Sequence, residues 1–419
     1  MDKFIIEGGR RINGKIKVDG SKNAALPIIA ATILFKKGTT VLKNVPPLRD
    51  IYTIKKMLEH LGAKIEYDAR TMVMRLDCSG ISNNLAPYDL MRQMRASFLV
   101  MGPLLARLGE ARVSLPGGCV LGARPVDYHI LGFRALGAAV TEDSGYVIAK
   151  AGRLEGATIH FDRPSHTGTE NIMFGAVLAK GTTRIVNAAC DPEVVDVADF
   201  LNRAGAKISG AGTSTVTIKG VRSLKPVDHK ITGDRLVAGT FMCAAAATGG
   251  SAEISGISPE HLTMVSQKLH EMGCHIEQRP ASLKIKAPKQ LKPVKAVTFP
   301  FPGFPTDLQP CLMALATIAS GTSSIKETVF EDRMGHTMEL RRLGANITVT
   351  LNEALINGVD KLIGASVMAS DIRAGAGLTI ASLAARGTSE LLRVYHIDRG
   401  YYKLEERLSR LGADIKRIS

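Results

Sequence analysis

A sixfold internal repeat is the feature that most constrains how this chain can fold. A glycine followed by alanine or cysteine, with a β-branched residue two positions further on, recurs at Gly62, Gly137, Gly205, Gly273, Gly344 and Gly412. The spacings are 75, 68, 68, 71 and 68 residues. A second mark, a glycine that precedes a β-rich run, recurs in each unit at Gly38, Gly109, Gly181, Gly250, Gly321 and Gly387. Two independent marks at one period predict six copies of one structural unit.

The pattern within each copy predicts its elements. A helix of small residues is followed by a strand, by a helix that ends at the repeated glycine, and by strands with period-two alternation. The first helix, for example residues 241–247 or 312–319, is apolar on all sides and should therefore be buried. Sheets outside and buried helices inside predict an α/β protein built from six βαβαββ-type repeats.

Length and the chain ends suggest two domains. At about 150 residues per domain, 419 residues correspond to two or three, and six repeats divide naturally into three plus three. The last repeat lacks its final strands, whereas residues 1–20 are strand-like, so the two ends should complete one repeat together. We expect one domain at residues 21–230 and another composed of residues 1–20 and 231–419.

Composition narrows the class of partner. The chain has 54 Lys and Arg against 39 Asp and Glu, a formal charge of +15 that favours an anionic ligand. The charge is dispersed, only 5% of residues are aromatic and there is no Trp, which argues against nucleic acid and favours a phosphorylated small molecule.

Location and cofactors are constrained by the same sequence. No apolar run reaches the ~20 residues of a membrane helix, and the first residues contain no apolar stretch of signal-peptide length, so we expect a cytoplasmic protein without membrane contact. Its six cysteines form no C-x-x-C pair, which argues against a zinc site or a redox dithiol. We expect neither a metal nor an organic cofactor.

Charged residues recur where the buried helices begin. Aligned by the repeat, the six starts carry Lys22 with Asn23, Arg95, Thr169 with Glu170, Arg235, Asp307 and Arg373. Four of the six starts carry a cation, although the helix dipole favours an anion there by ~0.3–1 kcal/mol. A solvated arginine would explain any one of them. The set suggests that a ligand supplies the missing anion.

A lone thiol lies in a glycine-rich segment, residues 114–127. Cys119 follows Gly117 and Gly118, and Arg124 comes five residues later. A free cysteine is most often a small buried residue. Here the glycines favour a lid, and the nearby arginine favours a thiol whose reactivity matters.

These segments, with others along the chain, resemble the enolpyruvyl transferases. The matching motifs are the Cys119 segment and residues 20–27 (GSKNAALP), 93–97 (QMRAS), 304–307 (FPTD), 327–333 (ETVFEDR), 369–374 (ASDIRA) and 395–401 (YHIDRGY). They span nearly the whole chain in the family's order. The resemblance implies an inside-out α/β barrel of two domains with three repeats each, an active site in the cleft between them, and a monomer.

The resemblance also implies a reaction. The enolpyruvyl group of phosphoenolpyruvate is transferred to the 3′-hydroxyl of UDP-N-acetylglucosamine by addition and elimination, and phosphate is released. This is the first committed step of peptidoglycan synthesis, and therefore of cell wall biogenesis, cell shape and cell division. The epoxide antibiotic fosfomycin targets this activity.

Roles follow by resemblance, residue by residue. Lys22, Arg124 and Arg399 are similar to the group that holds the phosphate of phosphoenolpyruvate, beside Asn23, and Arg333 with Arg373 to the pair that binds its carboxylate. Cys119 resembles the proton donor and Asp307 the acceptor of the sugar hydroxyl's proton, with Asp371 as the next candidate. The UDP-sugar positions are Asn23, Arg95, Arg124, Pro125, Val126, Asp127, Tyr128, Asp307 and Val329, and further candidates are Arg163, Ser165 and His166. Residues 162–169 depart from the family's usual Ser-Val-Gly-Ala-Thr form.

Three other functions are alternatives to this reaction. The shikimate-pathway enolpyruvyl transferase shares the fold but lacks the Pro-Gly-Gly-Cys lid and the Arg-Pro-Val-Asp corner. A non-catalytic nucleotide-sugar-binding paralogue would be expected to replace Cys119 or Asp307, and both are present. A basic nucleic-acid-binding scaffold lacks aromatic platforms. Asp307 and Asp371 could each be only a helix-start acid, and we expect His396 and Asp398 to be packing partners of Arg399.

Overall fold

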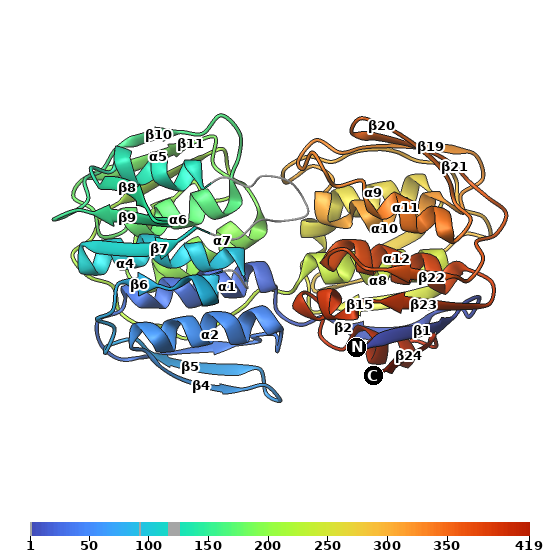
Figure 1. The fold of residues 1–419 in the computed structure, drawn as a ribbon, viewed down its shortest axis with the longest axis horizontal. Coiled ribbons are helices and arrows are strands. Elements are labelled where there is room, and N and C mark those ends of the chain that lie inside the picture. The colour runs from blue at the N-terminus through green and yellow to red at the C-terminus, as the bar shows by residue number, and fades with distance from the viewer. Residues whose placement is uncertain (1, 92–93, 116–125) are drawn as a thin grey trace. The chain divides into compact units, whose positions relative to one another are not determined.

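The chain folds into two compact units (Figure 1). A computed structural model describes residues 2–91, 94–115 and 126–419, without the side chain of residue 95. One unit contains the described residues between 20 and 232, and the other contains residues 2–19 together with Gly233–Ser419.

The unit of residues 20–232 contains three copies of the repeat. The first has α1 (Lys22–Ala31), η1 (Thr32–Leu34), β3 (Thr39–Lys43), α2 (Arg49–Leu61), β4 (Lys64–Asp68), β5 (Val73–Asp77) and β14 (His229–Lys230). The second has β6 (Leu85–Ala86), α3 (Tyr88–Met91), η2 (Arg95–Val100), α4 (Met101–Leu108), β7 (Glu110–Ser114), α5 (Asp127–Ala135), β8 (Ala139–Asp143) and β9 (Tyr146–Lys150). The third has β10 (Thr158–His160), α6 (His166–Ala176), β11 (Thr182–Val186), α7 (Pro192–Arg203), β12 (Lys207–Ser209) and β13 (Thr215–Lys219).

The other unit contains the remaining three copies. The fourth has β2 (Asn13–Lys17), α8 (Arg235–Ala247), β15 (Ser251–Ser255), η3 (Pro259–Leu262), α9 (Thr263–Glu271), β16 (His275–Arg279) and β17 (Ser282–Lys286). The fifth has β18 (Lys295–Val297), η4 (Thr306–Leu308), α10 (Gln309–Ala316), β19 (Thr322–Lys326), α11 (His336–Arg342), β20 (Asn346–Thr350) and β21 (Glu353–Asn357). The sixth has β22 (Ser366–Met368), α12 (Ile372–Ala384), β23 (Thr388–Leu392), η5 (Val394–Arg399), α13 (Leu404–Arg410), β24 (Asp414–Ile418) and β1 (Lys3–Glu7).

Each copy forms one four-stranded sheet of the same topology. The strand orders are β14-β3-β5-β4, β6-β7-β9-β8, β10-β11-β13-β12, β2-β15-β17-β16, β18-β19-β21-β20 and β22-β23-β1-β24. In each sheet the first pair is parallel and the others are antiparallel. The predicted α/β fold of six βαβαββ-type repeats is confirmed.

The N-terminal strands complete sheets formed by distant parts of the chain. Strand β1 lies between β23 and β24, where Ile5 is paired with Glu390 on one side and Lys416 on the other. The prediction that the two chain ends complete one repeat together is confirmed. Strand β2 in turn pairs with β15, and β14 pairs with β3.

Helix burial and helix ends explain why the repeat folds in this way. Every residue of α8 from Arg235 to Ala246, and of α12 from Arg373 to Leu383, is buried, as expected for helices that are apolar on all sides. All six glycines of the first repeat mark have positive φ, between 87° and 111°. This conformation lets the second long helix of each repeat end without the strain that a side chain would add. The buried helices begin with charged residues, and these starts carry the candidate site.

Candidate functional site

The structure places the predicted residues at the helix starts. Lys22 and Arg235 are the first residues of α1 and α8, and Arg373 is the second residue of α12. Residue 95 begins η2, which continues into α4, and Asp307 lies in η4, which leads into α10. The alignment of the repeats therefore placed these five positions at or next to the helix starts, whereas α6 begins at His166, three residues before Thr169.

Two of these helix starts already have an anion from the chain itself. Asp234 caps α8 by accepting hydrogen bonds from the amides of Leu236 and Val237 at 2.9 and 3.0 Å. Asp371 caps α12 in the same way, with the amides of Arg373 and Ala374 at 2.8 and 3.0 Å. At α8 and α12 the chain itself supplies an anion to the helix start, because a capping aspartate precedes the first turn.

Helix α1 differs from α8 and α12. Its N-cap, Ser21, makes no side-chain capping hydrogen bond, and the Ser21 hydroxyl is buried without a hydrogen-bond partner among the described residues. The ammonium of Lys22 lies 3.4 Å from the carboxylate of Asp50, at the start of α2, and both side chains are buried. A cation at an uncapped helix start is suited to an anionic ligand.

Asp307 lies between two buried arginines. Arg333 Nη1 is 2.8 Å from Asp307 Oδ1, and Arg373 Nε is 3.0 Å from Asp307 Oδ2. Each arginine is 4% exposed, so their charges are shielded from water. The cluster shows that this pair of guanidiniums can bind one carboxylate together, with one arginine at each oxygen.

Arg373 is also held from its other side. Its Nη1 donates a hydrogen bond to the hydroxyl of Tyr401 at 3.0 Å, and that hydroxyl lies 2.9 Å from the hydroxyl of Thr240 in α8. Burial lowers the pKa of Arg373, but the electrostatic effects of Tyr401 and Asp307 outweigh it, and the pKa is raised. Arg373 therefore keeps its charge within the protein interior.

Arg399 lies at the end of η5, which packs on α12. Burial, and next the positive charge of Arg399, lower the pKa of His396, so the imidazole is close to that guanidinium. Asp398 binds Arg417 of β24, with Asp398 Oδ2 3.1 Å from Arg417 Nη1. Asp398 thus ties η5 to the C-terminal strand.

In the unit of residues 20–232, the starts of α5 and α6 lie side by side. The Thr167 hydroxyl is 3.4 Å from Nε2 of His129, and Nδ1 of His129 is 2.8 Å from the side-chain amide of Asn171. The ring of Tyr128 packs against Phe161 with centroids 4.9 Å apart. The predicted UDP-sugar residues at these two helix starts are therefore brought together.

The start of α6 combines a cap with a charged pair. Ser165 caps the helix by accepting a hydrogen bond from the amide of Gly168 at 3.2 Å. Nε2 of His166 is 3.1 Å from a carboxylate oxygen of Glu170, which is 1% exposed. Burial lowers the pKa of His166, but the charge and hydrogen bond of Glu170 outweigh it and raise the pKa to about 10. Burial also raises the pKa of Glu170, so at neutral pH the pair holds at least one proton between the two side chains.

Other predicted site residues are more exposed or lie outside the described part of the chain. Arg163 and Asp127 are exposed, whereas Asn23 and Val126 are half-buried. Cys119, Arg124, Pro125 and the side chain of Arg95 fall outside the described residues, so their predicted roles stay predictions.

Sequence reasoning missed four residues that hold the Asp307 cluster, namely Thr240, Thr306, Glu327 and Tyr401. Three of them, Glu327, Thr306 and Tyr401, lie within the motifs at 327–333, 304–307 and 395–401. Their place in these motifs was the signal by which the sequence could have identified them. Thr240 lies in the middle of α8 and carried no signal in the sequence.

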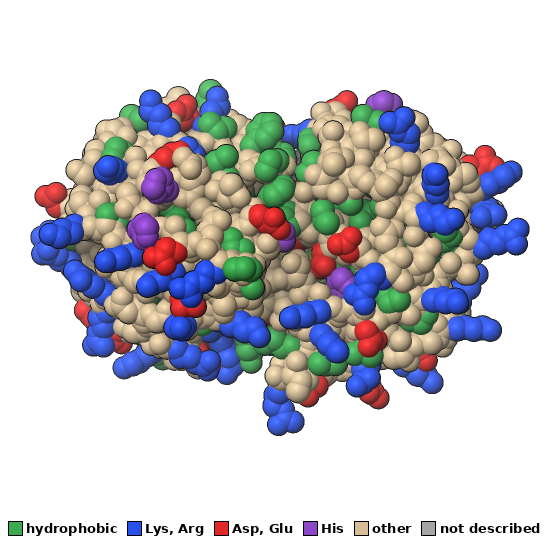
Figure 2. Space-filling view, turned by 180° about the vertical axis from the view of Figure 1, so that it is seen from behind, with side chains coloured by type: hydrophobic (Ala, Val, Ile, Leu, Met, Phe, Trp, Pro, Cys, Tyr) green, Lys and Arg blue, Asp and Glu red, His purple; other side chains and the backbone are tan. Residues whose placement is uncertain are grey.

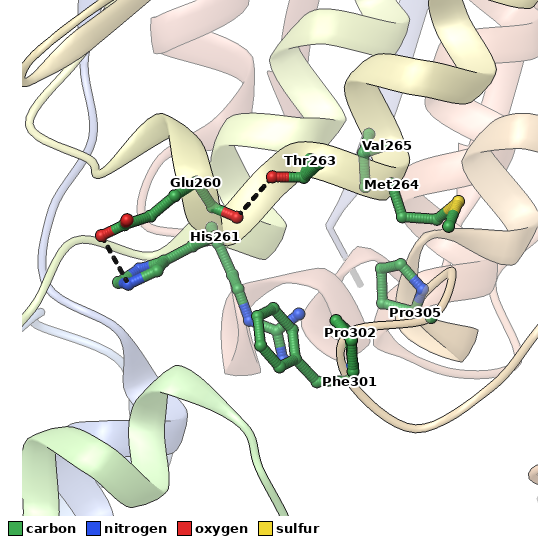
Figure 3. Close-up of a pocket in the computed structure, with 10 residues that line it drawn as sticks. Glu260, His261, Thr263, Met264, Val265, Phe301, Pro302 and Pro305 are labelled. Atoms are coloured by element: carbon green, nitrogen blue, oxygen red, sulfur yellow. Dashed lines mark hydrogen bonds and ion pairs between the residues drawn. The ribbon is translucent and has the colours of Figure 1, made fainter. Parts of the chain in front are cut away.

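A pocket of about 290 Å³ lies in the same unit as the Asp307 cluster, and Figure 3 shows the side chains that line it. Its walls include Met264, Phe301, Pro302 and Pro305, and Pro305 comes two residues before Asp307. The guanidinium of Arg235 lies over the ring of Phe301, 5.3 Å from its centroid. The pocket thus combines apolar walls with the polar side chains of Arg235, Glu260, His261 and Thr263.

On the face seen in Figure 2, Lys and Arg side chains are spread widely and do not gather in one patch. Within residues 2–91, 94–115 and 126–419, no group of three or more His, Cys, Asp or Glu side chains is arranged to hold a metal ion. No helix in those ranges has the length and apolar character needed to cross a bilayer.

Known proteins match this chain over its full length. The family model for EPSP synthase (3-phosphoshikimate 1-carboxyvinyltransferase) matches residues 6–408. The UDP-N-acetylglucosamine 1-carboxyvinyltransferase of Desulfosudis oleivorans is 52% identical over 419 residues and covers 100% of both chains. The protein of the same name from Myxococcus xanthus is 50% identical over 418 residues, covering 100% of this chain and 99% of its own.

Two solved structures are similar in fold. The enolpyruvyl transferase NikO from Streptomyces tendae superposes with a TM-score of 0.89 at 26% identity, and covers 99% of this chain and 98% of its own. EPSP synthase from Acinetobacter baumannii has a TM-score of 0.78 at 18% identity, with 100% of both chains covered. The second likeness concerns the fold alone.

Proposed function

Because the chain belongs to the EPSP synthase family of enolpyruvyl transferases, we propose that it transfers the enolpyruvyl group of phosphoenolpyruvate to the 3′-hydroxyl of UDP-N-acetylglucosamine. Phosphate is the second product. The acceptor is that of the relatives with about 50% identity over the whole chain, whose name states it. The reaction is the first committed step of peptidoglycan synthesis.

The observation that carries the proposal is the convergence of Arg333 and Arg373 on one carboxylate, that of Asp307. Two buried guanidiniums that already bind a carboxylate are suited to the carboxylate of phosphoenolpyruvate. Two guanidiniums beside Asp307 also stabilise its ionised form, and a substrate carboxylate that binds the same groups reduces this effect. Substrate binding therefore makes Asp307 a better proton acceptor at the moment it is needed.

The chemistry is addition followed by elimination. The methylene carbon of phosphoenolpyruvate accepts a proton from Cys119, Asp307 takes the proton of the 3′-hydroxyl, and the sugar oxygen bonds to the central carbon to form a tetrahedral ketal. Loss of a proton from the methyl group and of phosphate then restores the double bond. Lys22, Arg124 and Arg399 bind the phosphate, and fixed positive charges stabilise it as it leaves.

The acceptor is bound by the residues at the starts of α5 and α6. The imidazole of His166 and the amides at the start of α6 are suited to the diphosphate of the UDP-sugar. Tyr128 lies beside them. We further propose that the protein acts as a cytoplasmic monomer, which sedimentation of the purified protein would test.

Release of phosphate from phosphoenolpyruvate tests the proposal. We expect release with UDP-N-acetylglucosamine as acceptor and none above background with shikimate 3-phosphate. The second acceptor is included because the family model bears the name of the shikimate-pathway enzyme. Release with shikimate 3-phosphate alone would replace the proposed acceptor, and binding of UDP-N-acetylglucosamine without any release would indicate a non-catalytic nucleotide-sugar-binding protein.

A further inference from the structure

A buried carboxylate, that of Glu327, lies behind the Asp307 cluster. Glu327 directly follows β19 and is 1% exposed. Its Oε1 accepts hydrogen bonds from the Thr298 hydroxyl at 2.7 Å and from the amides of Val329 and Phe330 at 2.8 and 3.1 Å. Burying a carboxylate is costly unless its oxygens are well bound, and three donors at one oxygen fix its position.

The other carboxylate oxygen of Glu327 is connected to Arg333 through Thr306. Oε2 accepts a hydrogen bond from the hydroxyl of Thr306 at 2.8 Å. The same hydroxyl oxygen accepts a hydrogen bond from Arg333 Nη1, also at 2.8 Å. A hydroxyl has one proton to donate and can accept with its lone pairs. Because Glu327 takes the proton of Thr306, the oxygen of Thr306 is turned toward Arg333 as an acceptor.

Arg333 has few other contacts that fix it. Nη1 contacts Thr306 and Asp307, and the guanidinium lies 5.2 Å from the centroid of the Phe330 ring. Nε is buried and has no hydrogen-bond partner among the described residues. Within the described part of the chain, the hydrogen bond from Arg333 to Thr306 is thus one of two polar contacts at Nη1, and its direction depends on Glu327.

We propose that Glu327 is a positioning residue for the recognition of phosphoenolpyruvate, and that it acts through Thr306 to orient Arg333 toward the substrate carboxylate. This inference rests on the proposed function, which gives Arg333 its ligand. Glu327 itself touches neither substrate. It sets the direction of two consecutive hydrogen bonds, Arg333 to Thr306 and Thr306 to Glu327.

Substitution Glu327→Gln tests this direction specifically. The amide oxygen of glutamine must face Thr298, Val329 and Phe330, because all three are donors. The amide NH₂ then faces Thr306, which meets two donors and loses its acceptor. The hydrogen bond from Arg333 is weakened while the shape of the site is kept.

The measurement is steady-state kinetics with each substrate varied in turn. We expect the KM for phosphoenolpyruvate to rise about tenfold in the Glu327→Gln variant, the effect of a weakened hydrogen bond to a charged group. The KM for UDP-N-acetylglucosamine should stay at the parent value. Glu353→Gln is the matched control, since Glu353 is exposed and accepts one hydrogen bond, from Ser324.

Two variants at Thr306 separate this role from simple loss of stability. Thr306→Val removes the hydroxyl and should also raise the KM for phosphoenolpyruvate about tenfold, whereas Thr306→Ser keeps the hydroxyl and should restore the parent value. Glu327 acts through Thr306. The KM for phosphoenolpyruvate of the variant with both Thr306→Val and Glu327→Gln should therefore be no higher than that of the more impaired single variant.

The outcomes are distinguishable. A parent protein that releases no phosphate would contradict the proposed function. An active parent whose Glu327→Gln variant has a lower melting temperature but the parent KM for phosphoenolpyruvate would show that Glu327 is merely structural. Effects of Thr306→Val and Glu327→Gln that multiply, or a Thr306→Ser variant as impaired as Thr306→Val, would also overturn the inference.

Discussion

Arg333 Nη1 lies 2.8 Å from Asp307 Oδ1, so the proposed proton acceptor is held by an arginine proposed to bind the carboxylate of phosphoenolpyruvate. The two roles are linked by this contact. Binding of the substrate carboxylate and activation of Asp307 become parts of one rearrangement, in which the guanidinium exchanges one carboxylate for another or shares its donors between them.

Substitution Asp307→Ala should lower kcat by about 100-fold or more, the effect of losing a general base. The KM for phosphoenolpyruvate should not rise, because Arg333 and Arg373 lose a competing carboxylate. Steady-state kinetics measures both. Asp360→Ala, at an exposed position of the same unit, is the control. A parent-like kcat would reduce Asp307 to a helix-start acid and make Asp371 the next candidate.

Substitution Tyr401→Phe should lower the free energy of unfolding by about 1.5–3 kcal/mol, because Arg373 loses a buried hydrogen-bond acceptor. Thr240 loses the same partner. Equilibrium unfolding in urea measures the change. The control is Tyr52→Phe, which removes a hydroxyl from a side chain that is 41% exposed and should change stability by less than about 0.5 kcal/mol. Equal stability of the two variants would show that the Arg373–Tyr401 contact contributes little.

The fold was predictable because its signals are local and repeated six times. Gly62 and its five counterparts mark where the second long helix of each repeat ends. This signal depends only on neighbouring residues in the sequence. The exchange of β2 and β14 between repeats was not predicted, since each strand pairs with a segment far away in the sequence.

The charged residues at the helix starts were predictable from the sequence. The hydrogen bonds that hold these residues were not. Thr306 and Glu327 are 21 residues apart, and Thr240 and Tyr401 are 161 apart. Their contacts depend on how the buried helices and loops pack. The cap at Asp371 was one of the alternatives from the sequence, and Asp234 could have been identified in the same way, because each immediately precedes the first turn of an apolar helix.

The His166–Glu170 pair predicts a dependence on pH. A histidine in an unfolded chain has a pKa of about 6.5, and that of His166 is raised to about 10. The stabilisation is therefore fully present below about pH 6.5 and is lost as the pH rises through about 10. ¹⁵N NMR of the imidazole should show a doubly protonated ring at pH 8, and Glu170→Gln should lower its midpoint. A parent midpoint near 6.5 would contradict the pairing.

Substitution Cys119→Asp should keep turnover, since a carboxyl group on the segment can still donate a proton, but should abolish inactivation by fosfomycin, since the nucleophilic thiol is gone. Activity after incubation with the epoxide measures both effects. Cys190→Ser, at a half-buried position, is the control. Persistent inactivation of the Cys119→Asp variant would place the target of the epoxide elsewhere.

The most direct test of the central claim is the structure of the product. Phosphoenolpyruvate labelled with ¹³C at its central carbon is incubated with the protein and UDP-N-acetylglucosamine, and the product is examined by NMR. The account predicts that the labelled carbon is joined through oxygen to C3 of the sugar and carries a vinyl ether double bond. Label on another hydroxyl, or label that remains entirely in phosphoenolpyruvate and pyruvate, would contradict it.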